Sequence, residues 1–223
     1  MTLPREDVTA GLVKELAAFE ALIRPLAPDE WTAPSRCAGW SAADVAAHVV
    51  GQMVDVTTGR LEGLGTPEVT ARQVTERQGR SPAELADELA ASTKIAGDML
   101  SGFDDALWAM PAPGGFDFTL GEGIEALWYD AYLHGDDIRA AVGQPSERSD
   151  GLTASISHLA GVLRRQGWGP ARLALDGSPE FSVGDDDGGG RRVTGDPLAF
   201  VLVASGRADP SSLGLDATVN VYR

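Results

Sequence analysis

The stretch that decides the fold is "TLGEGIEALWYDAYLHGDDIRAAV", residues 119–142. Its apolar residues recur every three or four positions, which is typical of a helix with one buried face. Thr119 and Glu122 have the spacing of a capping box, in which each side chain bonds the backbone amide of the other residue. The pattern therefore predicts a helix that opens at Thr119 and extends to about Val142.

Asp130 and His134 are four residues apart in this helix, so both side chains leave from the same face. His134 lies within the apolar stripe, and Asp130 lies about 40° away from it at ~3.6 residues per turn. Burial of a carboxylate and an imidazole is costly unless both are satisfied. The two residues could form an ordinary helix-stabilising pair or belong to a metal site.

Three further amphipathic helices are expected in the N-terminal part of the chain. The second of them opens with a capping pair, Ser41 and Asp44, and the third opens with Ser81 followed by a proline. Four helices with short to medium connections favour an antiparallel bundle. The three helices are expected at residues 6–26, 41–59 and 81–100.

The pattern changes after residue 146. One more helix is expected over residues 151–166, followed by short strand-like runs that surround the turn-rich "GDDDGGGRR". An Asp196-Pro197 pair opens an apolar helix, and "TVNVYR" alternates like a final strand. The chain is thus expected to be α+β, with a four-helix bundle at residues 1–146 and a small α+β domain at residues 147–223. The strands are expected at residues 171–177, 180–185, 191–195 and 218–223.

Composition limits the classes of function. A net charge of -15 disfavours nucleic acid and anionic membranes as partners. A single cysteine, Cys37, excludes both a disulfide framework and a thiolate zinc cluster. No stretch approaches the ~20 apolar residues of a membrane span, and the N-terminus lacks a secretory pattern. We expect a cytoplasmic monomer or homodimer that acts on small molecules.

The chain has three histidines, which restricts any histidine-based metal site. His48 and His134 both fall on core-facing sides of their helices, whereas His158 is expected to be structural or exposed. Each inward histidine could simply be bonded to a backbone carbonyl. Together with Asp130 they could instead form a ligand set with one open position, as in catalytic zinc sites. Nickel, iron or manganese would accept the same donors.

Three segments resemble a known family. "CAGWSAADVAAHVVG" and "ALWYDAYLHGDDIRAAVG" resemble two blocks of the mycothiol-dependent maleylpyruvate isomerase family, within the DinB-like metalloenzyme superfamily. "VTGDPLAFVLVASGRADPSSLGLDA" resembles the sterol-carrier-like C-terminal domain of that family. The resemblance implies a DinB-like bundle that binds a divalent metal, followed by a sterol-carrier-like domain.

The resemblance also implies roles for individual residues. The family's metal ligands, typically on zinc, fall on His48, Asp130 and His134, although the family has glutamate where this chain has Asp130. Asp137 matches an acidic residue that either supports the second histidine or is a surface charge. Arg207 matches an arginine associated with activity, which in the family faces the metal across the domain cleft. Alternatively, Arg207 caps the preceding helix. Cys37 is expected to be an ordinary buried or half-buried thiol.

The activity implied by the resemblance uses mycothiol as co-substrate. We expect a metal-dependent enzyme that isomerises a small electrophile, similar to maleylpyruvate isomerase, or a thiol transferase that joins the thiol to the electrophile (S-transfer). Because Asp130 departs from the family pattern, the maleylpyruvate reaction itself is not assumed. The alternatives are a small-molecule-binding protein of the same fold without thiol chemistry, for instance in a natural-product pathway, and an interaction module with no ligand.

Overall fold

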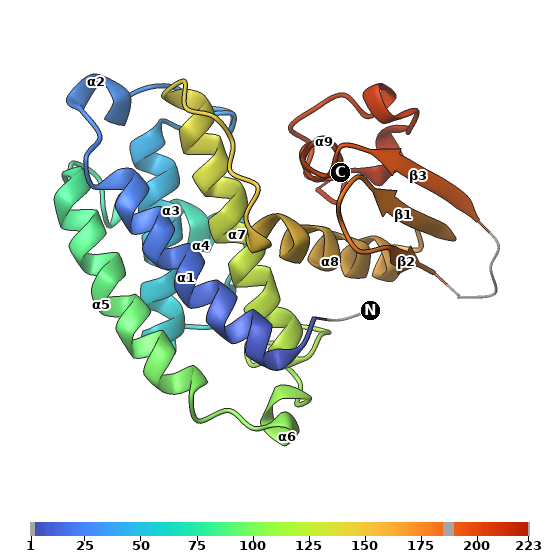
Figure 1. Ribbon diagram of the computed structural model, residues 1–223. Helices are drawn as coiled ribbons and strands as arrows, with labels where there is room; N and C mark the ends of the chain where they lie inside the picture. The colour runs from blue at the N-terminus through green and yellow to red at the C-terminus, as the bar shows by residue number, and fades with distance from the viewer. Residues whose placement is uncertain (1–2, 185–189, 223) are drawn as a thin grey trace. The chain divides into compact units, whose positions relative to one another are not determined.

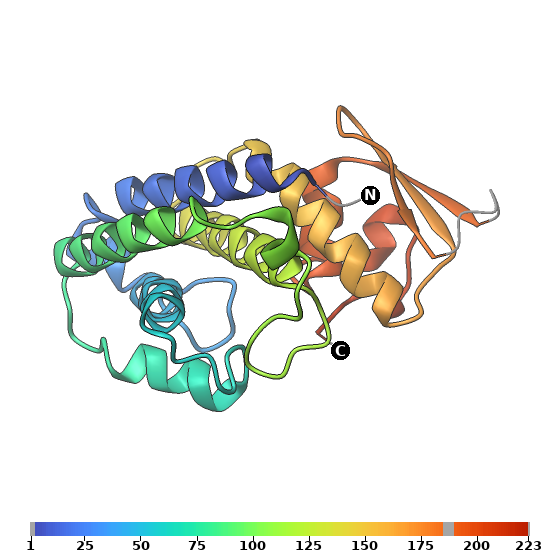
Figure 2. The same ribbon diagram turned by 90° about the horizontal axis from the view of Figure 1, so that it is seen from below.

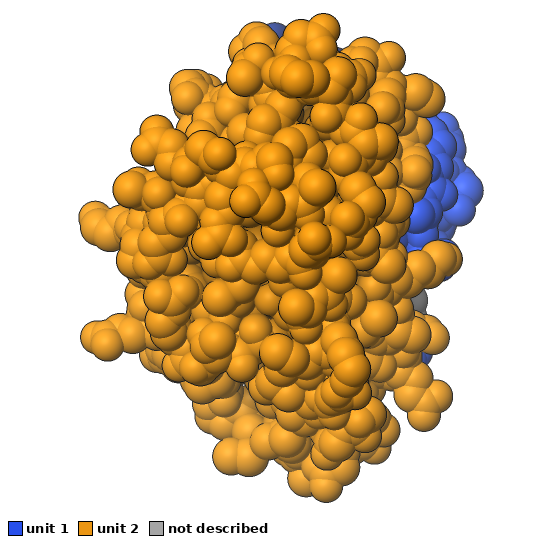
Figure 3. Space-filling view, turned by 90° about the vertical axis from the view of Figure 1, so that its left-hand side faces the viewer, with its two compact units in different colours: residues 1–4, 148–223 blue, residues 5–147 orange. Residues whose placement is uncertain are grey.

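The structure is a computed structural model that describes residues 3–184 and 190–222, so part of the turn-rich run 184–192 lies outside the described residues. The chain divides into two compact units, coloured separately in Figure 3. One unit consists of residues 5–147, and the other is made mainly of residues from 148 onward.

The first unit is a bundle of four long helices (Figure 1). Helix α1 packs against both α5 and α7, and α3 packs against the same two helices, which closes the bundle. The long helices are α1 (Arg5–Ile23), α3 (Ala42–Thr58), α5 (Pro82–Leu100) and α7 (Leu120–Ala141). The connections hold the short helices α2 (Pro28–Trp31), α4 (Pro67–Thr75) and α6 (Asp105–Trp108).

The predicted helix starts are confirmed. Ser41, Ser81 and Thr119 are N-caps, and each forms a reciprocal capping box with the acidic residue three positions later. The first helix ends at Ile23, three residues earlier than expected. The reason is Pro25, which has no amide to donate and disfavours helical geometry in the residue before it.

The core of the bundle follows the predicted stripes. In α1 the side chains of Val8, Leu12, Leu16 and Phe19 are buried, at helical spacing, and burying each contributes about 1.5–3 kcal/mol. In α7 the stripe is partly displaced, because Trp128 is buried whereas Leu127 is half-buried. None of the helices described in the structure is long and apolar enough to cross a membrane.

Helix α4 was not expected from the sequence, and it lies against α3 outside the four long helices (Figure 2). Its N-cap is Thr66, whose hydroxyl accepts from the amide of Val69, and Pro67 occupies the first turn. The close approach of the two helices depends on Gly51 of α3. A Cβ atom at this position would lie 2.6 Å from the Cβ of Gln73 in α4.

The second unit combines helices with a three-stranded sheet (Figure 1), which confirms the α+β class. Strand β1 is central, antiparallel to β2 and parallel to β3. Helix α8 packs against α9 and β2. The elements are α8 (Asp150–Arg165), β1 (Ala171–Leu175), β2 (Phe181–Val183), β3 (Arg191–Gly195), α9 (Pro197–Ala204), η1 (Pro210–Leu213) and η2 (Ala217–Val219).

The predicted final strand at residues 218–223 is wrong. A 3-10 turn, η2, occupies the start of this segment, and the Asp216 carboxylate caps it by accepting from the Thr218 amide at 2.9 Å. The amide of Val221 then donates to the carbonyl of Ala204 at the end of α9. Val219 and Val221 are both buried, so their alternation reflects packing against the unit's core rather than membership of a sheet.

Candidate metal centre

Three predicted ligands converge in the bundle. His48 comes from α3, whereas Asp130 and His134 come from α7, one turn apart. One donor atom of each lies within 4.8 Å of the other two. The His48 Nε2 atom is 3.6 Å from Asp130 Oδ2, and the His134 Nε2 atom is 3.5 Å from Asp130 Oδ1.

These separations fit donors around one ion. They are long for hydrogen bonds, yet two atoms bound tetrahedrally to zinc at about 2.0–2.1 Å lie about 3.3 Å apart. The imidazole rings of His48 and His134 stand nearly perpendicular, with centroids 5.2 Å apart. The histidines are buried, whereas the side chain of Asp130 is 20% exposed. The Oδ2 atom of Asp130, which faces His48, is itself buried.

The second nitrogen of His134 is held by Asp137. Its Nδ1 atom lies 3.0 Å from Asp137 Oδ2, and since a carboxylate only accepts, Nδ1 carries the proton and donates. This leaves the lone pair on Nε2, toward Asp130. Carboxylates commonly orient metal-bound histidines in this way. Asp137 is fully buried, so the alternative that it is a surface charge is wrong.

The second nitrogen of His48 meets an amide from α4. Its Nδ1 atom lies 2.9 Å from Gln73 Oε1, and the indole ring of Trp40 packs against the imidazole with centroids 5.5 Å apart. Burial lowers the pKa of His48, but the Asp130 carboxylate and the hydrogen bond with Gln73 outweigh burial, so the pKa is raised above its ordinary value. A proton would therefore compete with a metal for the Nε2 atom of His48, the nitrogen that faces Asp130.

The loop before α3 is tied to α7 beside the site. The guanidinium of Arg36 forms ion pairs with Asp136 and Asp137, the latter through Nε at 3.1 Å. Cys37, which is half-buried, lies with Sγ 3.3 Å from Asp137 Oδ2 and 3.8 Å from His134 Nδ1. Cys37, His134 and Asp137 could form a second donor group. However, Asp137 already pairs with Arg36 and His134, so this group supports the site.

The other two predicted residues lie in the second unit. Arg207 follows α9, and its Nη1 atom donates to the carbonyl of Ser205 at 3.2 Å. This contact is the one that the helix-capping alternative requires. His158 lies in α8 and is half-buried, which agrees with a structural role.

Sequence reasoning missed two residues that hold the site. Arg36 stands in an irregular loop, where no periodicity marks its direction. Gln73 lies in α4, whose start could have been recognised from Thr66 followed by Pro67, a frequent pair at a helix N-terminus. Even then, nothing in the sequence indicates that this glutamine faces His48.

Comparison with known proteins identifies the family and the fold. A family model described as the mycothiol maleylpyruvate isomerase N-terminal domain matches residues 12–139. Two crystal structures of mycothiol-dependent maleylpyruvate isomerase share the fold, each with a TM-score of 0.63. Their identities are 18% and, for a histidine-to-alanine mutant, 17%, and the alignments cover 97% of this chain and 98% of theirs. No curated protein sequence matches the chain.

The family match spans both helices that carry the candidate ligands, α3 and α7, together with the loop and the helix α4 that hold them. It covers more than half of the chain, and the resemblance inferred from the sequence blocks is confirmed. The chain belongs to the mycothiol maleylpyruvate isomerase N-terminal domain family.

Proposed function

We propose that the protein is a metal-dependent enzyme that uses a low-molecular-weight thiol, such as mycothiol, to isomerise a small electrophile, or that transfers the thiol itself to the electrophile (S-transfer). One observation carries the proposal. His48, Asp130 and His134 direct three donor atoms to one point, and both histidines are held through Nδ1 so that Nε2 faces that point.

The donor set fits a divalent ion, with zinc proposed first and nickel, iron or manganese accepting the same nitrogen and oxygen ligands. When bound, such an ion lowers the pKa of a coordinating thiol enough to deprotonate it. The chain's own residues hold the site: Asp137 orients His134, and the Arg36 guanidinium compensates the charge of Asp137.

The reaction class follows from thiolate chemistry. A thiolate that adds to a carbon–carbon double bond conjugated to a carbonyl forms a carbon–sulfur bond, and the electron pair of the double bond moves to the carbonyl as an enolate. The former double bond can then rotate. Expulsion of the thiolate from the enolate restores the double bond as the trans isomer, so the thiol is regenerated. We propose that Arg207 binds the carboxylate or enolate of the substrate.

Metal analysis of two histidine variants tests the proposal. Protein purified without chelator should carry about one divalent ion per chain, and His134→Ala should lose it, because two remaining ligands hold a metal poorly. His158→Ala, which changes the histidine of the second unit, is the matched control and should retain the ion. In a screen of a few small electrophiles, a maleyl substrate among them, wild-type protein should show turnover only when mycothiol is present.

Two outcomes would contradict the proposal. Full metal occupancy in His134→Ala would show that the ligands are assigned wrongly. Retained metal with no thiol-dependent turnover, combined with melting shifts on adding small apolar molecules, would instead favour the binding-protein alternative.

A further inference from the structure

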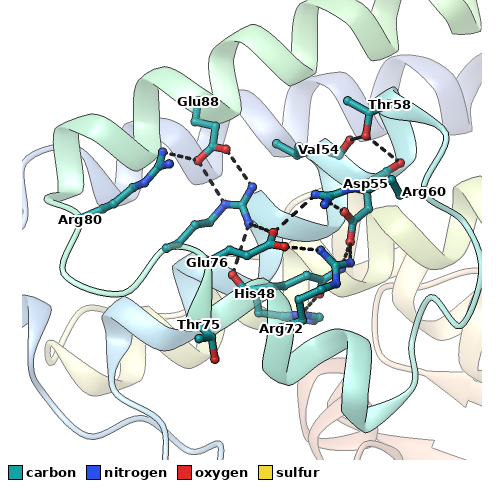
Figure 4. Close-up of polar contacts among 12 residues, drawn as sticks. His48, Val54, Asp55, Thr58, Arg60, Arg72, Thr75, Glu76, Arg80 and Glu88 are labelled. Atoms are coloured by element: carbon teal, nitrogen blue, oxygen red, sulfur yellow. Dashed lines mark hydrogen bonds and ion pairs between the residues drawn. The ribbon is translucent and has the colours of Figure 1, made fainter.

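The side chains behind His48 form a continuous polar chain from the metal-site histidine to the outer side of α3. Gln73 accepts at one end of its amide from His48, and the other end of the amide meets Asp55, with Nε2 2.7 Å from Asp55 Oδ2. Gln73 and Asp55 are almost completely buried. Asp55 in turn pairs with Arg60 and Arg72, at 2.7 and 2.6 Å (Figure 4).

The donor and the acceptor of each hydrogen bond between His48 and Asp55 can be assigned by starting from Asp55. Asp55 lies between two guanidinium groups, so it is a carboxylate and can only accept. Gln73 must therefore present its NH2 group to Asp55 and its carbonyl oxygen to His48. A flipped amide would place an oxygen against the carboxylate and leave two buried groups unsatisfied, which is unfavourable in a buried position.

The orientation of the amide determines the tautomer of His48. Because the Gln73 oxygen only accepts, the proton of the neutral imidazole must be on Nδ1, and the lone pair must be on Nε2. That lone pair faces Asp130 and His134. His134 reaches the same state through a direct hydrogen bond from Nδ1 to Asp137.

We infer that Gln73 and Asp55 are positioning residues that hold His48 in the tautomer able to bind a metal. The inference rests on the proposed function only where metal affinity is measured, in the second of the two tests below. The histidine is oriented from α4, a helix that contributes no ligand, through an amide anchored by a carboxylate and two arginines. Outer partners of this kind typically change metal affinity by about 10–100-fold when removed.

The first test needs no variant and no metal. Nitrogen-15 NMR of the imidazole rings in metal-free protein, at a pH where they are neutral, should show the Nδ1–H tautomer for His48. The opposite tautomer would overturn the inference. Since no ion is present, this result is independent of whether the proposed enzymatic function holds.

The second test removes each link. Gln73→Met keeps the length of the side chain but not the acceptor, and should weaken zinc binding by about 10–100-fold in competition with a chelator. Asp55→Asn touches no histidine, yet frees the amide to flip, and should produce a mixture of His48 tautomers with weaker zinc binding. The double variant should bind zinc about as weakly as Gln73→Met alone, because both changes act through one chain.

Arg77→Met is the matched control for loosened packing. Arg77 is buried in the turn that follows α4 and pairs with Glu88; it touches Gln73 only at the backbone carbonyl, to which its Nη1 atom donates at 3.3 Å, and not at the side-chain amide. It should lower the melting temperature but leave the tautomer and zinc affinity of the protein near wild type. An equal loss of affinity in this control, or strictly additive losses in the double variant, would overturn the inference. Should Gln73→Met fail to fold, the Asp55→Asn tautomer measurement decides.

Discussion

Substituting Gly51 by alanine tests whether α4 is seated against α3 as the structure shows. The added Cβ would lie 2.6 Å from Gln73 Cβ and 2.8 Å from Gln73 Cγ. These carbons are close to the backbone and cannot swing away, so α4 itself must shift. Overpacking lowers the free energy of unfolding by about 1–3 kcal/mol. We expect the upper part of that range because the added Cβ would clash with two carbon atoms.

The higher helix propensity of alanine partly offsets this loss of stability. Alanine is favoured over glycine inside a helix by about 1 kcal/mol, which leaves a net loss of roughly 1–2 kcal/mol for Gly51→Ala. For a chain of this size that corresponds to a melting temperature lower by about 2–8 °C. Differential scanning calorimetry of the metal-free protein measures the shift.

Gly97 provides the matched control. It also lies within a long helix, α5, but a Cβ there would meet only Val13 Cγ2, at an ordinary contact distance of 3.8 Å. Gly97→Ala should therefore raise the melting temperature, with a gain of up to about 1 kcal/mol. If both alanine variants were equally stabilised, the close seating of α4 at Gly51 would be refuted.

Two further predictions concern the second unit. Arg207→Ala should leave metal content nearly unchanged while thiol-dependent turnover falls. Arg207→Lys should restore turnover only partly, because an ammonium lacks the planar two-pronged donor geometry of a guanidinium. A lower melting temperature with normal turnover would instead show that Arg207 caps the helix end at Ser205. Asp196→Ala should cost about 0.5–2 kcal/mol by calorimetry, since the Asp196 carboxylate caps α9 through the Ala199 amide at 2.9 Å. Burial raises the pKa of Asp196, but the bond to Ala199 and the pair with Arg148 outweigh it, so the pKa is lowered. The stabilisation from the charged Asp196 carboxylate is thus complete above the ordinary aspartate pKa and is lost as the pH falls below about 4. The difference in stability between Asp196→Ala and wild type should therefore narrow in acid. A difference that widens in acid would contradict this.

Helices α3, α5 and α7 of the bundle could be predicted because each begins with a local capping pattern. Ser41, Ser81 and Thr119 mark their helices through contacts within three residues, and the stripes that follow them are long. The predicted strand at the end of the chain was wrong for the opposite reason, because no comparable local pattern defines that segment. Val219 and Val221 carry an alternating pattern too short to distinguish a strand from a capped turn with two buried side chains.

Helix periodicity could predict only those residues of the candidate site that lie in long helices. His48, Asp130 and His134 could be placed on inward faces because they lie in long helices. Gln73 could not, since its nine-residue helix shows no clear stripe and its partner is 25 positions away in the chain. Arg36 is 101 positions from Asp137, a separation that only the tertiary fold closes.

The ion pairs of Arg36 also set a balance of charge around the candidate site. Asp130, Asp136 and Asp137 bring three negative charges, and Arg36 brings one positive charge, while the two histidines are neutral when they act as ligands. These residues are therefore left with two negative charges, which a single divalent cation would neutralise. A monovalent ion would leave one negative charge uncompensated in the bundle, and a trivalent ion would introduce an excess positive charge. At the proposed site, this charge balance would favour a divalent ion over ions of other valence, whichever metal the nitrogen and oxygen donors then select.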